Sequence, residues 1–146
     1  MSVNIQKIME NSKNEFTLIC AGLIYSDDIV DLNEIKYSHK LISKMFGDII
    51  SLSEFIDVVN NYEDDSINKV MKNFYDKNKQ LLSGYEKEYL IITLIILGLS
   101  DFEITKKEII YLKSFAKSLN LSDKIVENLI QKTNNFTEKI RPENIL

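Results

Sequence analysis

Ser26-Asp-Asp-Ile-Val-Asp-Leu-Asn-Glu-Ile-Lys-Tyr37 returns 74 residues later as Ser100-Asp-Phe-Glu-Ile-Thr-Lys-Lys-Glu-Ile-Ile-Tyr111. In this register Ser, Asp, Glu, Ile and Tyr coincide, and Val30 stands opposite Ile104. Self-similarity at a fixed separation predicts an internally duplicated domain. We expect one domain over residues 1–146, with repeat 1 at about 12–61 and repeat 2 at about 84–133. Each repeat reads as helix, acidic loop, helix, turn and helix.

Helix breakers are rare, because the chain has only one proline and four glycines. Apolar residues recur at spacings of three and four, the period of an amphipathic helix. This pattern predicts helices over residues 1–25, 31–46, 51–61, 64–82, 83–99, 105–119 and 122–133. Ser12 with Glu15 is expected to restart a helix inside the first of these. The fold class is therefore all-α, a compact bundle of seven to eight helices.

Composition excludes several classes of function. A net charge of -4 and a pI near 5.1 argue against nucleic-acid binding, which needs a basic patch. The apolar run Tyr89–Leu99 is too short to cross a bilayer and suits a buried central helix. A single cysteine, Cys20, and a first segment without an apolar signal core predict a cytoplasmic protein. One histidine, His39, without a nearby nucleophile predicts that the chain is not an enzyme and that His39 has a surface or helix-packing role.

Both copies contain the pattern Asp-x-x-[Ile/Val]-x-x-x-Glu. The same spacing forms the second half of an EF-hand calcium loop. The first half of that loop needs oxygen donors where this chain has Leu23 and Tyr25 in one copy, and leucines in the other, so an EF-hand is excluded. The glutamates fit a local structural role instead, because Asp31-Leu-Asn-Glu34 and Thr105-Lys-Lys-Glu108 are capping-box patterns.

Capping does not explain Asp27 and Asp101, which lie four residues before each cap. Carbonyl groups at a helix C-terminus favour a nearby cation over an anion. Two interpretations of these aspartates stay open, a purely structural turn and a divalent-cation site for calcium or magnesium. In the second interpretation the metal ligands are Asp27, Glu34, Asp101 and Glu108.

The two acidic stretches resemble the TerB-like family of tellurite-resistance and stress-response domains, in which Ala-Asp-Gly-x-Ile-x-x-x-Glu occurs twice. Leu119-Asn-Leu-Ser122 is similar to the family's Leu-Gly-Leu-Ser, and the resemblance covers about residues 12–133. It implies an all-helical fold whose two loops approach across a pseudo-twofold axis and whose acidic residues bind a metal ion or partners. The family's glycine is replaced by Asp28 in the first loop and by Phe102 in the second.

Lys36, Lys40 and Lys44 share one face of the helix after the first loop. Such a face is either simply solvated or a contact for an acidic partner. We expect a non-enzymatic binding or scaffold domain whose partner is another protein. The candidate contact residues are Asp28, Asp31, Glu103, Lys36 and Lys40. The alternative is a host- or phage-encoded interaction factor, an inhibitor or immunity protein, that uses the same fold without metal.

Overall fold

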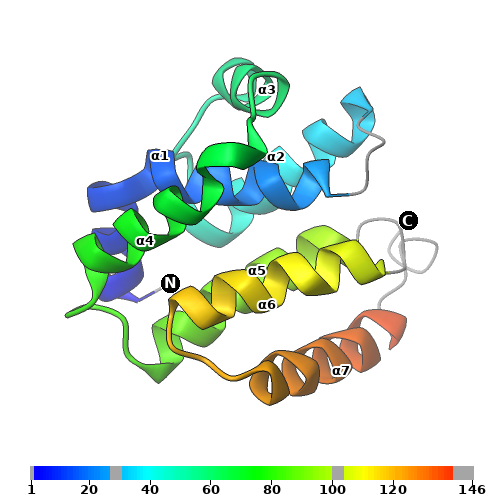
Figure 1. The fold of residues 1–146 in the computed structure, drawn as a ribbon. Helices are drawn as coiled ribbons and strands as arrows, with labels where there is room; N and C mark the ends of the chain where they lie inside the picture. Colours follow the sequence, from blue (N-terminus) through cyan, green and yellow to red (C-terminus); the bar gives the residue numbers. More distant parts are fainter. Residues whose placement is uncertain (1, 27–30, 100–103, 140–146) are drawn as a thin grey trace.

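The computed structural model describes residues 2–26, 31–99 and 104–139 (Figure 1). Over these residues the chain forms seven α-helices, one short 3-10 helix and no strand, which confirms the predicted all-α class. The elements are α1 (Val3–Tyr25), α2 (Leu32–Phe46), α3 (Leu52–Asn60), η1 (Asp64–Ser66), α4 (Ile67–Asn78), α5 (Gly84–Gly98), α6 (Lys106–Ser118) and α7 (Asp123–Lys139). No helix of the described part is long and apolar enough to cross a membrane.

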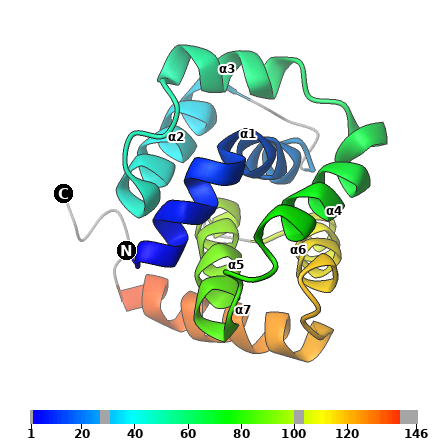
Figure 2. The same cartoon turned by 90° about the vertical axis from the view of Figure 1, so that its left-hand side faces the viewer.

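The helices α1 and α5 lie at the centre and pack against each other (Figures 1 and 2). On one side α2 and α3 cover α1, while α6 and α7 cover α5 on the other, and α4 packs on α1 and α6. Contacts also cross between the halves, because α1 touches α6 and α5 touches α2. The same pairs of helices therefore meet in each half, and the internal duplication itself stays a prediction.

A series of aromatic rings joins four of the helices inside the core. Phe16 of α1 lies 5.0 Å from Phe46 of α2 and 5.9 Å from Phe74 of α4, measured between ring centroids. Phe74 in turn lies 5.9 Å from Phe115 of α6. Because offset and edge-to-face ring pairs add to the gain from burial, this series fixes how the outer helices sit on α1.

The first helix is broken at Ser12, as the sequence predicts. Ser12 has the non-helical angles φ -153° and ψ 32°, and its hydroxyl donates to the Ile8 carbonyl at 2.7 Å. The side-chain amide of Asn78 donates to Ser12 Oγ and to the Phe74 carbonyl, both at 2.8 Å. A serine whose hydroxyl bonds to the carbonyl of the preceding turn bends a helix. The Asn78 amide supplies the hydrogen bond that the buried Ser12 hydroxyl oxygen accepts. Glu15 forms an ion pair with Lys77 of α4.

Three local predictions were wrong in detail. The helix predicted over 64–82 begins as η1 and ends at Asn78, because the Asn78 side chain turns inward and Leu81 N–H donates to the Asn78 carbonyl. Ser83-Gly-Tyr-Glu86 has the sequence pattern of a capping box, but the Ser83 side chain accepts no backbone N–H and instead donates to Glu86 Oε1 at 2.5 Å. The last helix continues past Thr133 to Lys139, a stretch that contains neither proline nor glycine.

Candidate functional site

The ends of the two central helices carry the acidic segments. In Figure 1 the C-terminal ends of α1 and α5 lie on the same side of the molecule. Four of the predicted site residues, Asp27, Asp28, Asp101 and Glu103, lie outside the described residues. Within residues 2–26, 31–99 and 104–139, no group of three or more His, Cys, Asp or Glu side chains is placed to hold a metal. The cation site stays a prediction.

At the second acidic segment the predicted capping box is formed. Thr105 Oγ1 accepts the Glu108 N–H at 3.1 Å, and Glu108 Oε1 accepts the Thr105 N–H at 2.9 Å. Glu108 is 4% exposed, and its Oε2 lies 3.2 Å from the position of an ideal Cβ on Gly98. One oxygen of this predicted metal ligand is therefore used in holding the start of α6, and Gly98 leaves room for the buried carboxylate.

At the first acidic segment Asp31 is the N-cap of α2. Its Oδ1 accepts the Glu34 N–H at 2.8 Å, which is the first half of the predicted capping box. Asp31 is exposed and Glu34 is half-buried. Asp31 was predicted as a partner contact, and the structure assigns it a folding role at the same time.

The outer face of α2 carries the remaining predicted contact residues. We define the α2 outer face as the exposed residues Leu32, Lys36, Tyr37, Lys40 and Lys44. Leu32 is 50% exposed and Tyr37 is 47% exposed, although both are large and apolar. Neither Lys36 nor Lys40 forms an ion pair with any residue that the structure describes. This surface therefore combines uncovered apolar area with unneutralised positive charge.

Tyr111, which stands at the same repeat position as Tyr37, has different surroundings. The hydroxyl of Tyr111 on α6 donates to the Ile19 carbonyl of α1 at 2.6 Å. Next to it, Tyr62 stacks on Tyr25 at 5.3 Å between ring centroids, and its buried hydroxyl has no hydrogen-bond partner among the described residues. Burial raises the pKa of both Tyr111 and Tyr62, and the neighbouring Asp64 carboxylate adds to the rise at Tyr62. Apart from the repeat register of Tyr111, no pattern in the sequence indicates this cluster.

His39 and Cys20 have structural surroundings. The Nε2 atom of His39 lies 2.8 Å from the Ile50 carbonyl, and its ring packs 6.0 Å from that of Phe55. This confirms the predicted helix-packing role, because His39 ties α2 to the start of α3. Cys20 is fully buried in α1, and burial raises the pKa of its thiol far above the usual value.

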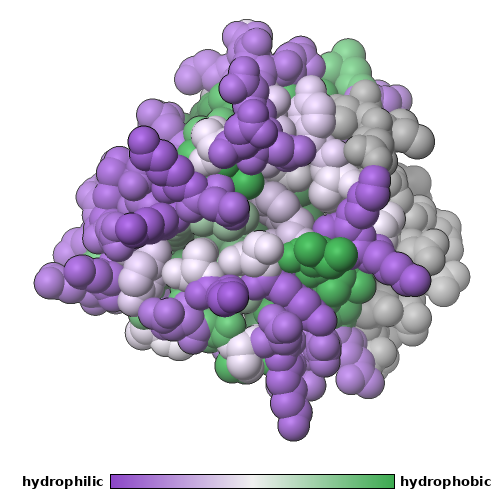
Figure 3. All heavy atoms as spheres, viewed as in Figure 1, coloured by the Kyte–Doolittle hydropathy of each residue, from purple (hydrophilic) through white to green (hydrophobic). Residues whose placement is uncertain are grey.

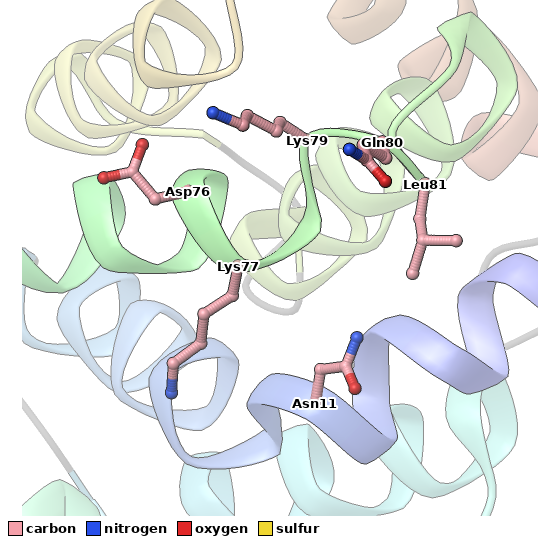
Figure 4. A pocket seen from close by; sticks show the side chains of 6 residues that line it. All are labelled: Asn11, Asp76, Lys77, Lys79, Gln80 and Leu81. Atoms are coloured by element: carbon pink, nitrogen blue, oxygen red, sulfur yellow. The ribbon is translucent and has the colours of Figure 1, made fainter.

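A surface pocket of about 430 Å³ lies between the kink of α1 and the end of α4. It is lined by Asn11, Asp76, Lys77, Lys79, Gln80 and Leu81 (Figure 4). Lys77 reaches toward α1, where it pairs with Glu15, while Asp76 and Lys79 point away from Asn11 (Figure 4). The polar groups of this pocket do not converge on one point, so it lacks the geometry of a binding site.

The surface formed by α4, α5 and α6 is mostly hydrophilic, with a small apolar patch over the α5–α6 region (Figure 3). Ile110 of α6 is a large aliphatic side chain that is 65% exposed. Isolated exposed apolar residues are common on protein surfaces and carry no functional meaning alone.

Comparison of the chain with protein-family models, with curated proteins and with solved structures finds no match. The resemblance to TerB-like domains therefore rests on the repeated acidic motif and its surroundings in the sequence.

Proposed function

We propose that this chain is a TerB-like binding or scaffold domain that contacts another protein through the α2 outer face. The observation that carries the proposal is the exposure of Leu32 and Tyr37 beside Lys36 and Lys40. Tyrosine and aliphatic side chains anchor many protein interfaces, where they become fully desolvated. The fold does not require an exposed tyrosine here, since Tyr111 at the same repeat position is hydrogen-bonded against α1.

A photo-reactive phenylalanine analogue in place of Tyr37 tests this function in the native cell. Tyr85, which is 55% exposed near the start of α5, is the matched control position. The proposal expects one discrete cross-linked protein from position 37 and none of that protein from position 85. Equal labelling from both positions, or none from position 37, would contradict it.

A second proposal concerns the acidic segments, where Asp27, Glu34, Asp101 and Glu108 would hold calcium or magnesium in a stress-response protein. It is supported by the C-terminal ends of α1 and α5, which lie on one side of the molecule and each precede an acidic segment in the sequence. Calorimetric titration with calcium, magnesium, manganese and zinc tests it. Heat of binding that disappears in Asp27→Ala with Asp101→Ala is expected.

The alternative is an inhibitor or immunity factor that uses the same helices without a metal. The use of Glu108 Oε1 in a capping box supports this version, because capping accounts for the repeated glutamate without a cation. Absence of heat at millimolar cation together with a cross-link from position 37 would favour it over the metal-dependent scaffold.

A further inference from the structure

The lysines of the α2 outer face form a row in which none is ion-paired to a residue that the structure describes. Lys36, Lys40 and Lys44 are exposed at spacings of four residues, where like charges on a helix repel each other. Neither Lys36 nor Lys40 has an aspartate or glutamate three or four residues away along α2. The neighbouring helix α3 carries the exposed Glu54 and Asp57, and no ion pair joins either of them to α2.

Several exposed lysines on other helices do have acidic neighbours. On α4, Lys69 follows Asp65 by four residues and Lys72 precedes Asp76 by four, the spacing that stabilises a helix. On α6, Lys113 donates to Glu127 of α7 at 2.9 Å. The chain has 22 acidic and 18 basic residues, so acidic side chains are in excess. Lys36 and Lys40 on α2 therefore carry a like-charge repulsion without the acidic neighbours that Lys69 and Lys72 have on α4.

We infer that the α2 outer face binds an acidic amphipathic helix of another protein; this inference rests on the protein-binding function proposed above. Residues four apart on a helix are separated by about 6 Å along its axis. A partner helix laid alongside α2 with carboxylates four residues apart matches the row Lys36, Lys40 and Lys44. Its adjoining apolar side chains cover Leu32 and Tyr37 at the two edges of the face, as in helix-in-groove recognition.

The same surface fits a polyanion poorly. Three lysines span about 12 Å of helix, which is few contacts for a nucleic-acid backbone that is bound through many phosphates. Leu32 and Tyr37 would stay uncovered against phosphates, whereas the apolar side of an amphipathic helix removes them from water.

An alanine-based helical peptide with three glutamates four residues apart, and leucines on the adjoining face, is the probe for this inference. Backbone amide shifts of the isotopically labelled full chain should change on α2 and not on α4. Lys36→Glu with Lys40→Glu should weaken binding about tenfold, because two attractions become repulsions. Lys69→Glu with Lys72→Glu, an equal change of charge on exposed helical positions, should leave the affinity unchanged. Circular dichroism of both double variants establishes that each is folded.

Several results would overturn the inference. These are equal binding of a peptide with glutamine in place of glutamate, unchanged affinity of the α2 double variant, or amide shifts centred on α4. Lysine-dependent binding to phosphatidylserine vesicles without peptide binding would assign the row to a membrane surface instead. If the cross-link from position 37 still forms in the Lys36→Glu with Lys40→Glu variant, the protein-binding function is supported and only the inference of an acidic partner helix is contradicted. If position 37 gives no cross-link in a chain that keeps Lys36 and Lys40, both the protein-binding function and the acidic-helix inference are contradicted.

Discussion

The hydroxyl oxygen of Tyr111 occupies the space above Gly22, where an ideal Cβ on the glycine would lie only 2.2 Å from it. This contact brings α6 against α1 and places the hydroxyl within reach of the Ile19 carbonyl. In the register of the repeat, Ile96 of α5 stands where Gly22 stands in α1. An isoleucine has a side chain where Gly22 has none, and the corresponding Tyr37 is 47% exposed. The close approach of Tyr111 to Gly22 is thus one difference between the two halves of the molecule.

Substitution of Gly22 should destabilise the fold strongly. In Gly22→Ala the new methyl group would collide with the hydroxyl of Tyr111 and with that of Tyr62, whose oxygen is 2.7 Å away. Overpacking of this kind costs about 1–3 kcal/mol of unfolding free energy. Gly84→Ala is the matched control, since a Cβ there has no neighbour within 4 Å. Urea unfolding that gives equal free energies for the two variants would contradict the close approach.

The buried tyrosines should make the protein less stable at alkaline pH. Burial raises the pKa of Tyr111 and Tyr62 in the folded state above the ordinary value of 10.0. Their contribution is therefore present below that pH and is lost as the pH rises above it, because the unfolded chain releases the protons first. We expect the free energy of unfolding to fall above about pH 10, and to fall less steeply in Tyr111→Phe. A pH-independent difference between the two proteins would argue against burial of this phenol.

Glu108 offers a way to separate helix capping from metal binding. Glutamine also serves in a capping box, so Glu108→Gln should lose less stability than Thr105→Ala, for which about 1 kcal/mol is expected. A cation held by Glu108 would raise the melting temperature of the unaltered protein and fail to raise that of Glu108→Gln. A glutamine variant that is less stable than Thr105→Ala without any cation would show that the capping box is not the main role of this carboxylate.

Replacing Ser38 with alanine should stabilise the protein. It is 1% exposed on the inner side of α2, and its hydroxyl has no hydrogen-bond partner among the described residues. The same repeat position in α6 is the core residue Leu112. Removing an unpaired buried hydroxyl relieves a desolvation cost, so Ser38→Ala should raise the free energy of unfolding by about 1 kcal/mol. A loss of stability in urea or thermal unfolding would mean that the hydroxyl has a partner.

The positions of most helices could be predicted because they depend on residues close together in the chain. Apolar spacing marked each helix, Asp31 and Thr105 capped α2 and α6 as expected, and Gly47 with its positive φ ended α2. The break at Ser12 was predicted from local sequence as well. The end of α4 was not, because it depends on the hydrogen bond from Asn78 to Ser12, which lies 66 positions earlier.

The candidate surface shows the same division between local and distant causes. The sequence by itself determined the helical class, the acidic repeat and the row of lysines on α2, since each follows from the spacing of neighbouring residues. Only the tertiary structure decided that Tyr111 is buried while Tyr37 is exposed, and that Glu86 faces Asn4 across the bundle. Tyr111 and Ile19 are 92 positions apart, and only the packing of α6 on α1 brings them together. The spacing of apolar residues indicates which face of a helix is buried. Which residue of another helix packs against that face depends on the shapes of the side chains and on the space next to a glycine.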